Sequence, residues 1–126
     1  VCVVDPGVTD ADLAALHAGG IRGVRFNFVR HLGGMPDMAF FRRVLAQVEP
    51  LGWHVVLHLD AEDIVPLAPV ISALRIPFMI DHMGRVKAKA GLGQPAFRQL
   101  LDLMENPLAW VKICGAERVS SAGAPF

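Results

Sequence analysis

Acidic and basic side chains follow directly after an apolar stretch in the second half of the chain. Residues 77–80 read Pro-Phe-Met-Ile, and residues 81–85 read Asp-His-Met-Gly-Arg. A short apolar run between proline and glycine is typical of a strand covered on both faces. α/β proteins place functional groups at the carboxyl ends of such strands. Two interpretations are open: His82 is catalytic with Asp81 beside it, or Asp81 caps a turn and His82 belongs to the core.

Four other apolar stretches also end in polar side chains. They are 1–4 with Asp5, 21–28 with Arg25 and Asn27, 54–60 with His58 and Asp60, and 110–114 with Lys112. Side chains alternate between the two faces of a strand. This alternation predicts that His58, Arg25 and Asn27 point inward, away from the covering helices.

The same alternation can be applied to the stretch before His82. Counted from an inward His82, it predicts that Phe78 and Ile80 point inward as well. Asp81 is then expected to point sideways and to orient its neighbours.

Helical patterns separate the five strand-like stretches. Thr9 precedes Asp12 by three residues, close to a capping box, and Asp37 is a predicted N-cap. Helices are predicted after these two positions and through 67–74 and 97–104. Strands that alternate with helices, without a hairpin signal, predict parallel βα units.

Two architectures are built from such units. A doubly wound sheet usually carries a Gly-rich first turn, and the sequence contains neither G-x-G-x-x-G nor a P-loop. A (β/α)8 barrel instead spreads polar residues over many strand ends. Five strands do not close that barrel, which typically needs about 250 residues. We therefore predict an α/β fold, a partial TIM-type barrel in which 1–126 form one domain, and expect a central fragment of a longer chain.

The composition narrows the classes of partner. The 126 residues are 53% hydrophobic, and their formal net charge is zero. The composition therefore shows no excess of positive charge of the kind that binds nucleic acid or anionic membranes. No apolar run reaches the roughly 20 residues of a membrane helix, and the first residues lack signal-peptide features. We expect a cytoplasmic protein with a small-molecule substrate. Cys2 and Cys114 are far apart and are interpreted as buried free thiols.

Four motifs occur in order along the chain: GVRFNFVR at 23–30, GWHVV at 52–56, DHMGR at 81–85 and ERVS at 117–120. Their order and spacing resemble those of the 2-pyrone-4,6-dicarboxylate lactonases in the amidohydrolase superfamily (amidohydrolase 2 type), over nearly the whole chain. The resemblance implies that the five strands correspond to the third through seventh strands of the barrel. It also implies a hydrolase that opens a lactone or related cyclic ester of a carboxylated molecule by water attack at the carbonyl.

The resemblance also implies roles for individual residues. His82 matches the histidine that closes the sixth barrel strand, a catalytic position in the superfamily. Arg25, Arg30 and Arg118 match arginines that bind substrate carboxylates, a role suited to the guanidinium fork. A solvated or structural ion pair is the other interpretation of each arginine. The superfamily's first-strand His-x-His and eighth-strand aspartate have no counterparts here, so these 126 residues alone are expected to be inactive.

His58 departs from the lactonase pattern, which has a tyrosine at this position, whereas this chain contains no Tyr. Metal-dependent relatives often have a histidine ligand there, so His58 and His82 are candidates to share a divalent ion such as Zn²⁺. Alternatively, the enzyme uses no metal, and His58 binds the substrate as the tyrosine would. Two other readings of the chain stay open: another metal-dependent amidohydrolase-type hydrolase or decarboxylase, and a non-catalytic half-barrel. Because the open sheet edges favour association, we also expect a homo-oligomer.

Overall fold

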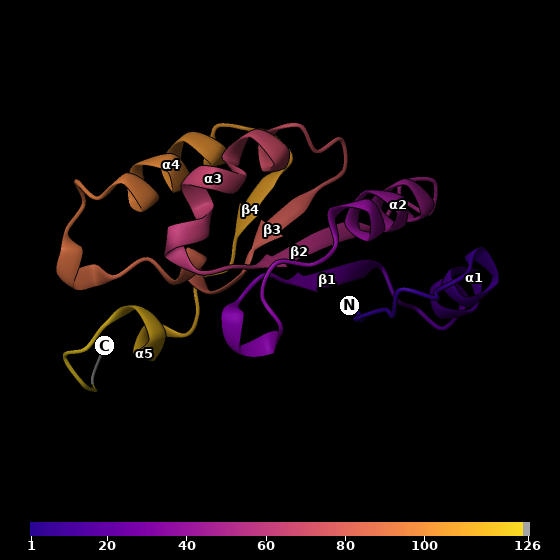
Figure 1. The fold of residues 1–126 in the computed structure, drawn as a ribbon, viewed down its shortest axis with the longest axis horizontal. Helices are drawn as coiled ribbons and strands as arrows, with labels where there is room; N and C mark the ends of the chain where they lie inside the picture. The colour runs from indigo at the N-terminus through magenta and orange to yellow at the C-terminus, as the bar shows by residue number, and fades with distance from the viewer. Residues whose placement is uncertain (125–126) are drawn as a thin grey trace.

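A four-stranded parallel sheet forms the centre of the structure, a computed structural model that describes residues 1–124 (Figure 1). Its strands are β1 (Gly23–Asn27), β2 (His54–His58), β3 (Phe78–Ile80) and β4 (Ala109–Val111), in that order across the sheet. Each neighbouring pair is parallel. All four strands therefore end at the same edge of the sheet, where the polar residues of the sequence gather.

Four helices of nine or more residues connect and flank the strands, as predicted. They are α1 (Asp10–Ala18), α2 (Met38–Val48), α3 (Ala61–Ser72) and α4 (Pro95–Met104), and a short α5 (Ala116–Val119) follows β4. The predicted capping box is confirmed, because Thr9 and Asp12 each accept a hydrogen bond from the other's backbone N–H. Three short 3-10 segments were not predicted: η1 (Arg30–Leu32), η2 (Asp81–Arg85) and η3 (Ala88–Ala90).

The hydrophobic core lies between the helices and one face of the sheet. Figure 1 shows α3 and α4 next to each other along the sheet, and the two helices are in contact. The strand residues of the core are Val24, Phe26, Val55, Leu57, Phe78 and Ile80. The helix residues that pack with them include Phe41, Val44, Ile64, Ile71, Leu100 and Leu103. The predicted outward face of β1 and β2 is therefore confirmed.

Phe78 and Ile80 contradict the predicted alternation on the central strand. Phe78 pairs with Val55 and Ile80 with Leu57, and residues paired across parallel strands share a face. Both side chains are fully buried in the helix-covered core, so the prediction that they point inward is wrong. The predicted alternation of side chains was counted back from His82, but the backbone at His82 does not continue the extended strand.

The predicted strand at 1–4 is present only as a single bridge. Cys2 pairs with Val24 of β1: its N–H donates to the Gly23 carbonyl at 3.0 Å, and its carbonyl accepts from the Arg25 N–H at 2.8 Å. Val1 and Val3 stay 59% and 65% exposed, so little apolar burial holds this segment against β1. The described chain thus has four strands and one bridge in place of five strands. None of its helices is long and apolar enough to cross a membrane.

Candidate active site

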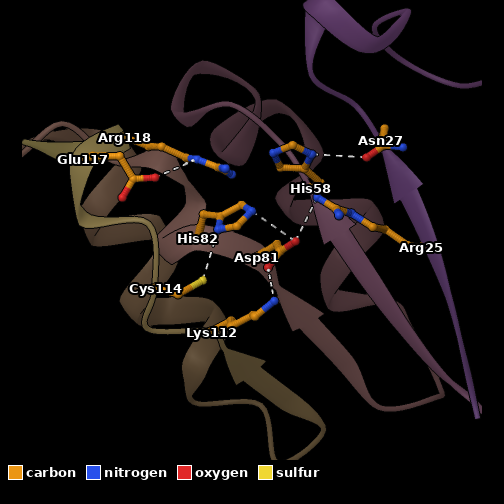
Figure 2. A network of polar contacts seen from close by, with 9 residues as sticks. All are labelled: Arg25, Asn27, His58, Asp81, His82, Lys112, Cys114, Glu117 and Arg118. Atoms are coloured by element: carbon orange, nitrogen blue, oxygen red, sulfur yellow. Dashed lines mark hydrogen bonds and ion pairs between the residues drawn. The ribbon is translucent and has the colours of Figure 1, made fainter. Parts of the chain in front are cut away.

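Polar side chains from all four strand ends meet on the sheet face that the helices leave uncovered (Figure 2). Arg25 and Asn27 come from β1 and His58 from the end of β2. Asp81 and His82 follow β3, and the residues after β4 supply Lys112 and Cys114. The parallel topology alone accounts for this convergence, since it places every strand terminus at one edge.

Asp81 is the buried centre of this group, with only 1% of the residue exposed. Its Oδ2 lies 2.9 Å from an Arg25 guanidinium nitrogen, and its Oδ1 lies 3.3 Å from Lys112 Nζ. A buried carboxylate requires such partners because its desolvation is costly. Asp81 therefore points into the site, and the prediction that it points sideways is wrong. The expectation that Asp81 orients its neighbours agrees with these two ion pairs.

A left-handed turn carries His82 into the same site as its neighbour Asp81. His82 has φ 52° and ψ 43°, and Met83 also has φ 52°. Residues other than glycine seldom adopt this region, and it costs roughly 1–2 kcal/mol per residue. Such outliers concentrate at functional sites. Because the chain turns here, two consecutive side chains face the same space, which an extended strand does not allow.

The His82 ring lies between three protein groups. Its Nδ1 is 3.1 Å from Cys114 Sγ, and its Nε2 is 3.5 Å from Asp81 Oδ2. The His58 ring stands at 73° to it, with 5.2 Å between the ring centroids. Burial lowers the pKa of His82, the Asp81 carboxylate opposes this effect, and the cations Arg118, Lys112 and Arg25 add to it. His82 is therefore a neutral imidazole near pH 7.

His58 is also a buried neutral imidazole. Its Nδ1 lies 3.2 Å from Asn27 Oδ1, and because that oxygen only accepts, Nδ1 carries the proton. Its Nε2 then has a lone pair, and it has no hydrogen-bond partner in the part of the chain that is described. Burial, with help from Arg25 and His82, lowers the pKa of His58 to about 4. This nitrogen can therefore accept a hydrogen bond from a ligand or bind a cation.

The predicted site residues are not equally close to this centre. Arg25, His58 and His82 lie together in it. Arg118 lies beside it on α5, half-exposed and paired with Glu117 at 3.2 Å. Arg30 is exposed on η1, and among residues 1–124 no hydrogen bond or ion pair joins it to the other four.

Three further residues near the centre were missed when the site was predicted from the sequence. The ring of the exposed His31 lies 6.3 Å from that of His58. The sequence predicts Lys112 only as a polar strand end, and Cys2 and Cys114 as buried free thiols; both cysteines are free thiols, but they are partly exposed, so the predicted burial is wrong. Lys112 could have been found, because it ends a strand beside Asp81. For Cys114 no sequence pattern indicated a contact with His82.

The fit of a metal ion depends on the donor atoms. Asp81, His82 and Cys114 offer ligand atoms within 4.8 Å of one another. However, different nitrogens of His82 face the thiol and the carboxylate, and Arg25 and Lys112 already bind that carboxylate. His58 Nε2 can bind a metal without losing a contact. His82 can bind one only if it gives up its contact with Cys114 or with Asp81. These residues do not form a closed metal site, and we assign no chemical step to a metal.

Comparison with known proteins places this chain in a family. The family model described as Amidohydrolase matches residues 1–126. The chain belongs to this amidohydrolase family. A 4-sulfomuconolactone hydrolase of Hydrogenophaga intermedia is 43% identical over 118 residues, and a 2-pyrone-4,6-dicarboxylate hydrolase of Comamonas testosteroni is 36% identical over 124. These matches cover 93% and 98% of this chain but only 39% and 41% of the relatives.

A solved structure supports the same assignment. The "probable 2-pyrone-4,6-dicarboxylic acid hydrolase" of Acinetobacter baumannii, with citric acid bound, superposes with a TM-score of 0.79 at 32% identity. The match covers 95% of this amidohydrolase chain and 45% of the other protein. The predicted fold class, parallel βα units of a partial (β/α)8 barrel, is confirmed, as is the resemblance to lactonases.

The lowered pKa of His58 predicts an acid-sensitive stability. The unfolded chain takes up a proton near the ordinary value of 6.5, whereas the folded chain takes it up only near 4. The unfolded state thus binds more protons between these values, so His58 lowers the free energy of unfolding as the pH falls from about 6.5 to about 4. We expect His58→Asn to weaken this decline, measured by urea unfolding of the purified protein across that range. His54→Asn, at the amino end of β2 and away from the site, is the control; an unchanged decline in His58→Asn would show that His58 is not held neutral.

Proposed function

We propose that this chain is the central part of a lactone hydrolase that acts on an anionic small molecule. The observation that carries the proposal is the pair of neutral imidazoles, the buried His58 and the partly buried His82, among three cations. Cationic side chains favour an anionic ligand, and neutral imidazoles supply a donor and an acceptor to a reacting ester. The named relatives are hydrolases of a sulfonated lactone and a dicarboxylated pyrone, and a related structure holds citric acid, a tricarboxylate.

Substrate binding in this proposal depends mainly on Arg118. Arg25 is committed to Asp81 at 2.9 Å, so most of its charge is already compensated. Within residues 1–124, the ion pair of the Arg118 guanidinium is with the exposed Glu117, so Arg118 can turn toward an anion. Its guanidinium would bind a carboxylate or sulfonate through two parallel N–H donors. Arg25 and Lys112 then contribute a positive field, and Arg30 contributes a more distant contact.

The chemical step in this proposal uses His82 as a donor to the lactone carbonyl. The proton on its Nε2 faces Asp81 across 3.5 Å, a long contact that leaves the N–H available to a substrate oxygen. Such a donor stabilises the negative charge that develops when water attacks the carbonyl. The ring C–O bond then breaks, and the released oxygen takes up a proton to give an alcohol or its tautomer beside the new carboxylate. Asp81 is a poor base for the water because two cations bind it; that role falls to an aspartate outside these residues.

Replacement of His82 tests the chemical step. Asparagine tolerates the left-handed backbone of this position better than most residues, so His82→Asn is expected to fold. We expect kcat for lactone hydrolysis by the complete enzyme to fall by about 10²–10⁴-fold, with KM changed much less. His17→Asn, on α1 and away from the strand ends, is the control. Near-normal turnover in His82→Asn would remove this residue from the chemistry.

Replacement of Arg118 tests substrate binding. Removing a charged hydrogen-bonding partner costs about 1.5–3 kcal/mol, so Arg118→Met is expected to raise KM about 10- to 100-fold. A smaller effect on kcat is expected, because the anion is bound in the ground state as well as the transition state. Arg98→Met changes an exposed arginine of α4 and should leave KM unaltered. An unchanged KM in Arg118→Met would contradict the carboxylate-binding role.

A metal-dependent amidohydrolase or decarboxylase is the second candidate, favoured by the partnerless Nε2 of His58. In this reading His58 and His82 hold a divalent ion such as Zn²⁺ with ligands from the rest of the enzyme. Elemental analysis of the purified complete enzyme should then give about one ion per chain, and less in His58→Asn. A metal-free enzyme with full lactonase activity would exclude this candidate.

We also propose that the complete protein is cytoplasmic and forms a homo-oligomer. Cell fractionation tests the location, and size-exclusion chromatography tests the oligomeric state.

A further inference from the structure

Cys114 touches the proposed catalytic imidazole from the side opposite Asp81 (Figure 2). Its Sγ lies 3.1 Å from His82 Nδ1, a hydrogen-bonding distance for sulfur. The backbone joins the same two segments, because the Met83 N–H donates to the Lys112 carbonyl at 3.1 Å. The segment after β4 and the turn after β3 are thus connected by both main chain and side chain.

The next residue, Gly115, lets this segment approach the ring closely. A Cβ added at Gly115 would lie 3.1 Å from His82 Nδ1 and 3.3 Å from Arg118 Cδ. Gly115 also has φ +70°, which favours glycine. The backbone after β4 is therefore shaped around the His82 ring.

The chemistry of the two neighbours determines where the His82 proton sits. Asp81 Oδ2 is an acceptor and faces Nε2, so a neutral ring is most stable with its proton on Nε2. Nδ1 then has a lone pair and needs a donor. The Cys114 S–H is a donor at this position, whereas the opposite tautomer would leave a lone pair facing the carboxylate.

We infer that Cys114 is a positioning residue for His82: its S–H donates to Nδ1 and keeps the proton on Nε2. This inference rests on the proposed function, in which Nε2–H is the donor to the lactone carbonyl. The partnerless Nε2 of His58, a residue only 3% exposed, lies on the side of its ring that faces Arg118 and His82 (Figure 2). The ring that Cys114 orients therefore faces the part of the site where a ligand would find an unused acceptor.

A thiol donating to Nδ1 also stabilises neutral His82 over imidazolium, which has no lone pair there. The other titratable and charged groups around the ring are Arg25, His58, Asp81, Lys112 and Arg118. None of these changes when only Cys114 is replaced. Loss of the thiol should therefore raise the pKa of His82.

The test compares Cys114→Ala and Cys114→Ser with Cys2→Ala in the complete enzyme. Cys2 is the other free cysteine and contacts the Gly23 carbonyl, away from His82. Loss of an orienting partner typically costs about 10- to 100-fold in activity. We expect that loss in kcat for Cys114→Ala with little change in KM, partial recovery in Cys114→Ser through its hydroxyl, and no effect in Cys2→Ala. Thermal unfolding of each variant separates a positioning effect from misfolding.

Imidazole ¹⁵N resonances, assigned with His82→Asn, report the tautomer without requiring activity. We expect the Nε2–H form in the wild type and a mixture, with a raised pKa, in Cys114→Ala. An identical tautomer, pKa and kcat in Cys114→Ala would overturn the inference, as would a loss in Cys2→Ala equal to that in Cys114→Ala. If the enzyme hydrolyses no lactone, the proposed function fails, while the ¹⁵N signals still decide whether Cys114 positions His82.

Discussion

The site depends on one buried carboxylate. Asp81 follows β3, and its two oxygens bind Arg25 of β1 and Lys112, which follows β4. These strands stand at opposite ends of the four-stranded sheet, so a single side chain links its outer members at the functional edge. Removing both cations would leave the carboxylate unpaired in a desolvated place, which costs more than the pairs stabilise. The ion-pair group is thus a geometric constraint on the site as much as a source of stability.

Burial, reinforced by the cations around Asp81, determines the state of the histidines. Burial already favours the neutral imidazole, and Arg25, Lys112 and Arg118 favour it further. A neutral ring has one donor and one acceptor. His58 uses its donor on Asn27, and His82 lies between a carboxylate and a thiol. The two rings therefore present different unused functions to the same space, an acceptor on His58 and an N–H on His82.

The left-handed turn at 82–84 costs conformational energy that the surrounding contacts must offset. Gly84 permits close packing there, since an added Cβ would lie 2.7 Å from Ile64 Cδ1. Arg85 anchors the end of the turn to Asp60 at 2.8 Å, which explains the polar residue after β2. In return, the turn brings Asp81 and His82 to one face, so that the carboxylate can orient both an arginine and an imidazole.

Local sequence patterns were sufficient to predict the βα order, the helix starts at Thr9 and Asp37, and the buried faces of β1 and β2. These follow from local capping chemistry and from alternation along extended strands, both of which operate within a few residues. Polar strand ends also placed Arg25, His58 and His82 among the candidate site residues. Three features depend on long-range packing: the direction of Asp81, the burial of Phe78 and Ile80, and the contact of Cys114 with His82. The reason is that a left-handed backbone at 82 breaks the alternation, and a thiol 32 residues away in sequence reaches the ring only through strand pairing.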